Sequence, residues 1–189
     1  MELIQRIING DHDALKTLYG ELGVKVYNTA LSYIQNEPEA EEITQDVFIE
    51  VFNSAHQFKH QSSLSTWIYQ ITVRKSLDAL KHKTRAKRFG DVISIFGFKE
   101  AEIDIPDFEH PGVIYEDKEE AKQLFATIYL LPEKQKTAFI LSYVEELPQK
   151  EVAEIMGLKL KAVESLLQRA KASLKEKLKN KYPHRRNSK

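Results

Sequence analysis

The chain of 189 residues has no cysteine, and glycine and proline are sparse, at 7 and 6 residues. Without thiols it forms neither disulfides nor thiolate metal sites. Its longest apolar runs, such as Leu124 to Leu131, fall far short of the roughly 18 to 20 residues that cross a bilayer. The N-terminus lacks the basic start and apolar stretch of a secretion signal. We therefore expect a cytoplasmic protein with no membrane insertion.

The residues that are present suffice for a folded core. Hydrophobic residues make up 42% of the chain and charged residues 30%, both ordinary for globular proteins. Apolar residues recur with the 3.6-residue period of helices, and no stretch alternates with the period of a strand. A chain of this length can hold two small domains. We predict an all-α fold made of two small helical domains.

Breaks in the helical pattern set the expected boundaries. Helices are expected at about 2–9, from Asp11 past Ala30, from Asn36 through Phe52, and at 63–88, 116–130, 133–145, 148–156 and 160–180. Residues 89–117 gather glycine, proline and acidic residues, with apolar residues too numerous for a solvated tether. The predicted domains are 1–90 and 116–182, with a linker at 91–115 and a basic tail at 183–189.

Charge is balanced overall but segregated along the chain. Lys plus Arg against Asp plus Glu number 4 against 10 in residues 1–60, 7 against 1 in 61–90, 2 against 10 in 91–120, and 11 against 4 in 151–189. Two cationic zones separated by an anionic one could hold two stretches of a single polyanion, while the acidic parts face a basic partner. Solvated helix surface remains the alternative for any one block.

The helix that begins at Asn36 has two contrasting sides. Ile43, Val47 and Val51 mark a buried side. Opposite them an acidic stripe carries a branched apolar residue in its middle, at positions i, i+4, i+7 and i+11: Glu42, Asp46, Ile49 and Asn53. The stripe is either a docking surface or a plain solvated face.

The C-terminal segment from Leu147 to Leu174 has the layout of a helix-turn-helix. Pro148 begins a short helix, Gly157 suits a positive-φ helix end, and a second helix follows. The inward stripe of this second helix is Val163, Leu167, Ala170 and Leu174, which leaves Lys161, Glu164, Ser165, Gln168 and Ala172 outward. Outward residues there can enter the major groove of DNA. The lysine-rich continuation favours DNA binding over a merely packed hairpin.

The stretch "STWIYQITVRK", Ser65 to Lys75, mixes aromatic rings with cations. Trp67 and Tyr69 are either packing residues or platforms on which unstacked bases lie. The basic run "KHKTRAKR" that follows exceeds what a favourable helix C-terminus would require, at about 0.3–1 kcal/mol per charge. Binding to a polyanion explains this excess better.

Three motifs together resemble the extracytoplasmic function (ECF) subgroup of the sigma-70 family of bacterial RNA polymerase sigma factors. "EAEEITQDVFIEVF" resembles the family's polymerase-binding helix, and "SLSTWIYQITVRKSLDALK" resembles its promoter-melting helix. "LPEKQKTAFILSYVEELPQKEVAEIMGL" resembles its −35-binding domain. The likeness covers about residues 5–88 and 116–180, as regions 2 and 4 of the family.

The resemblance implies partners and a role for each surface. The partners would be core RNA polymerase, through its β′ clamp helices and β flap, promoter DNA at its −10 and −35 elements, and an anti-sigma factor. The implied polymerase-binding residues are Glu42, Gln45, Asp46, Ile49 and Asn53. The implied −10 contacts are Phe58, Ser62, Ser63, Trp67, Tyr69, Arg74, Lys75, Lys81 and Arg85. The implied −35 contacts are Lys161, Glu164, Ser165, Gln168, Arg169, Ala172 and Lys175. The acidic linker would thread through the polymerase.

Some residues depart from the family pattern. Arg74 stands where the family often has Asn, and the second helix of the helix-turn-helix starts at Lys159 without the usual Ser cap. Glu164 and Leu166 occupy positions where basic residues are frequent. Glu164 weakens phosphate contact there but can accept from a cytosine amino group.

Other classes of function remain as alternatives. A stand-alone helix-turn-helix regulator would need neither the acidic stripe nor the basic aromatic helix. An all-helical metal-dependent nucleotide phosphohydrolase would use the carboxylates of residues 39–46, but the six His are scattered without ligand spacing. An adaptor that does not touch DNA would leave both basic blocks unused. We therefore expect a non-enzyme with no cofactor, metal or small-molecule substrate.

Overall fold

The structure is a computed structural model that describes residues 2–93 and 118–181. Helices account for the regular structure of these residues, and no strand occurs among them, which confirms the predicted all-α class. They group into two compact units. One unit holds residues up to Ala55 and the part of α4 from Ile71 onward, and the other holds His56–Gln70 and the helices from α5 to the C-terminus. No helix of the described residues is long and apolar enough to span a bilayer.

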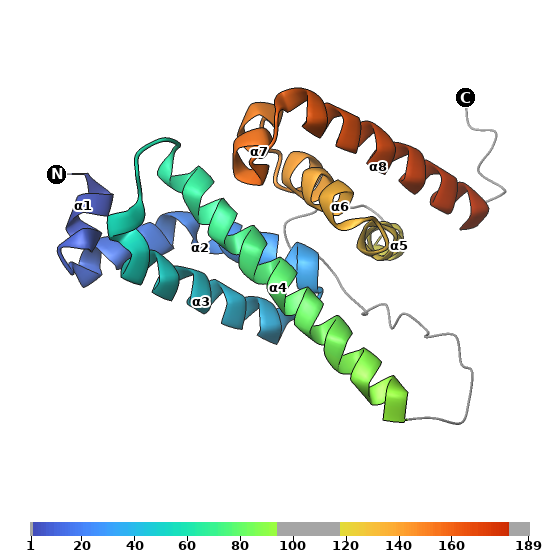
Figure 1. The fold of residues 1–189 in the computed structure, drawn as a ribbon, viewed down its shortest axis with the longest axis horizontal. Helices are drawn as coiled ribbons and strands as arrows, with labels where there is room; N and C mark the ends of the chain where they lie inside the picture. Colours follow the sequence, from blue (N-terminus) through green and yellow to red (C-terminus); the bar gives the residue numbers. More distant parts are fainter. Residues whose placement is uncertain (1, 94–117, 182–189) are drawn as a thin grey trace. The chain divides into compact units, whose positions relative to one another are not determined.

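The first unit is built on a helical hairpin. Helix α1 (Leu3–Ile8) precedes α2 (His12–Ile34) and α3 (Glu37–Ser54), and α2 and α3 pack side by side (Figure 1). The turn between them is set by Gln35 in the left-handed region, at φ 52°, and by Asn36, whose side chain accepts a bond from the Glu39 amide at 3.0 Å. An N-cap of this kind satisfies a backbone donor that the helix leaves unpaired.

The core of the first unit comes from the apolar stripes of its helices. Side chains with less than 8% exposure include Ile4, Ile7, Leu18, Val26, Leu31, Ile43, Val47, Val51 and Ile71. Burial of such stripes is the main source of helix stability in a folded protein, because packing of an apolar face contributes more than intrinsic helix propensity. The core fixes which side of α3 and α4 stays exposed.

Helix α4 (Leu64–Ile93) is longer than the sequence predicted. The expected helix end near Arg88 was wrong by five residues, because Gly90 continues the helix instead of ending it. A single glycine inside a helix costs about 1 kcal/mol, which neighbouring residues can outweigh. The rest of the predicted linker, residues 94–115, lies outside the described residues, as does the basic tail at 183–189.

The second unit contains the helix-turn-helix. Its helices are α5 (Lys118–Tyr129), α6 (Glu133–Phe139), α7 (Gln149–Met156) and α8 (Leu160–Lys181). A π-helical turn, Ile140–Val144, continues α6, where the sequence predicted ordinary helix to residue 145. Gly157 ends α7 at φ 62°, and the Leu158 amide donates to the carbonyl of Ala153 at 2.9 Å. The core gathers Phe125, Ile128, Leu131, Ile140, Leu141, Val152, Val163, Leu167, Ala170 and Leu174.

Candidate functional site

The outer face of α3 presents every residue predicted to bind polymerase. This acidic face consists of Glu42, Gln45, Asp46, Ile49 and Asn53, and all five are exposed. The exposed fraction of Ile49 is 58%, although its neighbours Phe48 and Val47 are buried. An exposed branched side chain framed by carboxylates suits a partner that carries cations around an apolar centre.

Ion pairs connect α3 to the basic helix α4. Glu50 pairs with Arg74 through one carboxylate oxygen and with Lys75 through the other, at 3.3 Å for Lys75. The Lys75 ammonium also lies 3.6 Å from the carboxylate of Asp46. Farther along, the Lys83 ammonium donates to Glu39 at 2.8 Å. Two of the cations predicted to contact DNA are thus already paired with carboxylates of α3.

The pKa of the Glu50 carboxyl records this pairing. Partial burial by itself would raise the pKa. The hydrogen bond and charge of Arg74, followed by those of Lys75, outweigh burial and leave the pKa below its usual value. Glu50 is therefore ionised at neutral pH.

An aromatic cluster closes the N-terminal end of α4. The ring of Phe58 lies 5.4 Å from that of Trp67 and 4.7 Å from that of His60, centroid to centroid. Phe58 and Trp67 are half-buried. Ser63 caps α4, since its hydroxyl oxygen accepts from the Thr66 amide at 3.0 Å, while the Ser62 hydroxyl donates to the Ser63 carbonyl at 3.3 Å. The structure thus brings together the predicted loop residues Phe58, Ser62, Ser63 and Trp67.

The other predicted −10 residues are less uniform. Arg74, Lys81 and Arg85 are exposed, and Lys75 is half-buried beside α3. Tyr69 is buried, with 4% of its surface exposed. Two residues along a helix turn by about 200°, which places Tyr69 on the side of α4 nearly opposite Trp67. This burial is what the packing alternative expects of Tyr69, and a role as a base platform stays a prediction.

The recognition helix α8 exposes its predicted DNA face. Lys161, Glu164, Ser165, Gln168, Arg169, Ala172 and Lys175 are all exposed. The inward residues Val163, Leu167, Ala170 and Leu174 are all buried, with 5% exposure or less. The Arg169 guanidinium donates to the Ser165 carbonyl at 3.2 Å, so this side chain lies along its own helix. Leu166 faces inward at 7% exposure.

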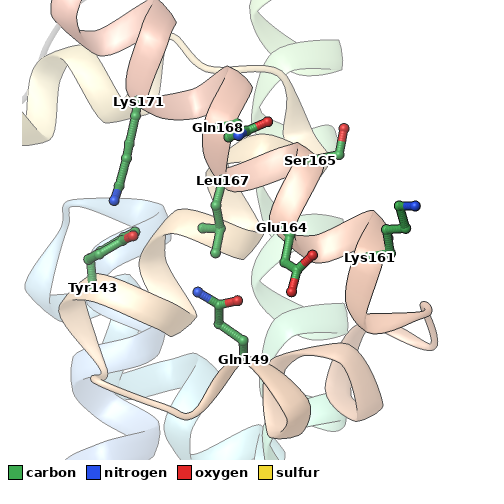
Figure 2. A pocket seen from close by; sticks show the side chains of 8 residues that line it. All are labelled: Tyr143, Gln149, Lys161, Glu164, Ser165, Leu167, Gln168 and Lys171. Carbon is green, nitrogen blue, oxygen red and sulfur yellow. The ribbon is translucent and has the colours of Figure 1, made fainter.

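A hollow of about 560 Å³ lies beside the exposed face of α8 (Figure 2). Its lining is Tyr143, Gln149, Lys161, Glu164, Ser165, Leu167, Gln168 and Lys171. The Lys171 ammonium lies 4.5 Å from the centre of the Tyr143 ring, a cation–π contact that holds its charge at the rim. Gln149, the first residue of α7, points toward α8 in Figure 2.

Sequence reasoning did not single out three residues at these surfaces. Gln149 and Tyr143 line the hollow, and Glu50 holds the cations of α4. Gln149 could have been found, because the first helix of a helix-turn-helix lies over the DNA backbone. The pairing of Glu50 could not, since it joins residues 24 apart on two helices.

Metal chemistry gains no support from the part of the chain that the structure describes. Within residues 2–93 and 118–181 no group of three or more His, Asp or Glu side chains is arranged to hold a metal ion. The carboxylates of residues 39–46 face solvent or α4, and no opposing set from another helix of these described ranges completes a ligand shell.

Comparisons with known proteins agree with the order of these surfaces. A family model described as "Sigma-70 region 2" matches residues 18–86, and one described as "Sigma-70, region 4" matches residues 122–174. The chain is 26% identical to the ECF RNA polymerase sigma factor SigW of Bacillus subtilis, covering 94% of this chain and 95% of that protein. It is 27% identical to the ECF RNA polymerase sigma-E factor of Haemophilus influenzae, covering 93% of each.

Solved structures share the fold. CnrH, solved in complex with the cytosolic domain of CnrY, matches with a TM-score of 0.68 at 21% identity, covering 94% of this chain and 96% of that one. RpoE of Bartonella quintana, solved with the anti-sigma factor NepR, matches with a TM-score of 0.64 at 19% identity, covering 87% and 96%. The matches to regions 2 and 4 occur in the order of the family. The alignments to the two ECF sigma factors cover nearly the full length of those proteins. The chain therefore belongs to the sigma-70 family of RNA polymerase sigma factors, in the ECF subgroup.

Proposed function

We propose that the protein binds core RNA polymerase and directs it to promoters, with region 2 acting at the −10 element and region 4 at the −35 element. The observation that carries the proposal is the presence in one chain of the acidic face of α3, the basic aromatic helix α4 and the exposed recognition face of α8. Family membership supplies the context in which these three surfaces act together. The protein acts in the cytoplasm, where promoters are.

Each surface has a proposed partner. The acidic face of α3 binds the clamp helices of the β′ subunit, with Ile49 as the apolar centre and carboxylates around it. The loop from Phe58 to Ser63, with Trp67, holds a base of the opened −10 element, and α4 adds cations for the phosphates. Gln168 and its exposed neighbours on α8 read the −35 element in the major groove.

Regulation by an anti-sigma factor is a further part of the proposal. Both solved relatives were captured with a bound partner, the cytosolic domain of CnrY for CnrH and the anti-sigma factor NepR for RpoE. An anti-sigma factor that covers one of the surfaces described above would keep this chain from the polymerase or from DNA.

The test is run-off transcription with purified core RNA polymerase and a library of genomic promoters. We expect the chain to start transcripts at a subset of promoters that share −35 and −10 sequences. A stand-alone regulator would instead bind specific duplex sites tightly without polymerase and would start no transcript. Failure both to associate with core polymerase and to direct initiation would overturn the proposal.

The role of the acidic face can be tested separately with Ile49→Asp. Removing an apolar anchor at the centre of an interface costs more than about 1 kcal/mol, so we expect core polymerase to be bound at least about fivefold more weakly. Competition for labelled core enzyme measures the change. The matched control is Ile8→Asp, which places the same charge on α1 at another exposed isoleucine. Equal losses in both variants would exclude a specific role for the acidic face.

A further inference from the structure

One carboxylate of α3 holds two cations of α4. The Glu50 cluster consists of Asp46, Glu50, Arg74 and Lys75. Glu50 receives the Arg74 guanidinium on one oxygen and the Lys75 ammonium on the other, at 3.3 Å for Lys75. Asp46 adds a second carboxylate at 3.6 Å from the same ammonium. Two negative and two positive charges therefore cancel within a single cluster of the first unit.

The inner members of the Glu50 cluster are the more enclosed. The exposed fractions of the Glu50 and Lys75 side chains are 30% and 24%, while those of Arg74 and Asp46 are 55% and 58%. Charges that are partly removed from water are screened less by salt than fully exposed ones. Salt therefore weakens the contacts of Glu50 less than it weakens contacts between fully exposed charges.

The pairing changes what Arg74 and Lys75 can do for DNA. A free cation that binds a phosphate releases a counterion, and this release drives non-specific binding. A cation that is already neutralised by a carboxylate must give up that partner first, which offsets the gain. Arg74 keeps donors beyond the nitrogen that faces Glu50, since a guanidinium carries five N–H groups. It stays available to a phosphate placed in one particular position.

We propose that Glu50 is a specificity-determining residue, which holds Arg74 and Lys75 on α4 so that they add little to non-specific DNA binding. The assignment of α4 to promoter DNA rests on the proposed function. The restraint of Arg74 and Lys75 rests on the contacts of Glu50 alone. It lowers the binding of a DNA duplex of any sequence. Its effect is to reserve two cations of region 2 for DNA that is correctly seated on α4.

The test measures the salt dependence of duplex binding by the full chain. A fluorescent duplex of random sequence is titrated with protein over a series of KCl concentrations, and binding is followed by anisotropy. Because each phosphate contact contributes about 0.9 to the slope of log K against log salt, Glu50→Gln should steepen the slope by about 1 to 2. Glu21→Gln is the matched control, because it removes the same charge from an exposed position on α2. Its slope should stay at the wild-type value.

Further variants test whether the change in slope comes from Arg74 and Lys75. Adding Arg74→Gln and Lys75→Gln to Glu50→Gln should return the slope to the wild-type value, because the released cations are then gone. Circular dichroism shows whether Glu50→Gln folds. If Glu50→Gln does not fold, the variant that carries only Arg74→Gln and Lys75→Gln tests the proposal. A fall in slope near 2 would then overturn the proposal, since both cations would already have been on phosphates.

Failure of this proposal can be told apart from failure of the proposed function. The anisotropy measurement contains no polymerase, so a wild-type chain that starts no transcripts leaves its result standing. A Glu50→Gln chain with the wild-type slope would overturn the restraint even if wild-type transcription is normal. A merely structural role of Glu50 would lower the melting temperature without steepening the slope.

Discussion

At the scale of single residues, Lys136 is a buried ionisable group of the second unit. It is buried in α6, with 8% of its surface exposed, and its ammonium lies 4.3 Å from the centre of the Tyr129 ring. Burial lowers its pKa to about 8 from an ordinary 10.5, although the charge of Glu133 acts in the opposite direction. A charged lysine at this place is therefore held at a cost in stability, which the face of the tyrosine ring reduces only in part.

Lys136→Met should stabilise the protein at neutral pH. Methionine keeps the unbranched apolar stem and removes the charge that burial disfavours. We expect the free energy of unfolding at pH 7 to rise by about 1 to 3 kcal/mol, since each unit of pKa shift corresponds to about 1.4 kcal/mol. Chemical denaturation measures this free energy of unfolding. Lys134→Met, at an exposed lysine of the same helix, serves as the control and should change the stability little.

The pH dependence of stability checks the cause. The folded pKa of Lys136, about 8, lies below the unfolded value, so the unfolded chain binds more protons between the two. The free energy of unfolding should therefore rise as the pH increases from about 8 to 10.5 in the wild type. This rise should be smaller in Lys136→Met. A rise of the same size in both proteins would show that other groups cause it.

At the scale of elements, Gly157 carries the turn between the two helices of the DNA-binding motif. Its φ of 62° is a conformation that costs a residue with a side chain about 1 to 2 kcal/mol. A Cβ at Gly157 would meet no atom within 4 Å, so the cost comes from the backbone alone. We expect Gly157→Ala to destabilise the protein by about 1 kcal/mol in chemical denaturation.

Gly20 offers the opposite case and is the control. It lies inside α2 with helical backbone, and a Cβ there also meets no atom within 4 Å. Alanine in a helix interior is better than glycine by about 0.5 to 1 kcal/mol, so Gly20→Ala should stabilise the protein. The two changes are chemically identical and should have opposite signs. The same sign in both would contradict the assignment of the Gly157 effect to its φ.

The elements also show what the sequence could predict and what it could not. Local signals placed the helix starts at Asn36 and Pro148 and the end at Gly157, because caps and positive-φ positions act within a few residues. The exposed faces of α3 and α8 followed from helical period. The pairing of Glu50 with Arg74 depends on how two helices pack, which period alone does not determine. The burial of Tyr69 belongs to the same class, since α4 has no purely polar side.

At the scale of the whole molecule, the surfaces of the proposed function lie on two compact units. Ile49 lies in the first unit, on the acidic face of α3, and Gln168 lies in the second, on the exposed face of α8. In the proposed function the first surface sets how much polymerase is bound, and the second sets which promoters are chosen. The two properties should therefore be separable by mutation.

The expected separation can be measured in run-off transcription with Ile49→Asp, Gln168→Ala and the double variant. Ile49→Asp should raise the polymerase concentration needed for initiation while the order of preferred promoters stays the same. Gln168→Ala should leave polymerase binding unchanged and relax the preference at one −35 position by about 1 to 3 kcal/mol, because a side-chain amide contacts a base edge there. Changes at sites without shared partners add as free energies, so the double variant should show the product of the two effects. A double variant that departs strongly from that product would mean that the α3 face and the α8 face are coupled before the polymerase brings them to one promoter.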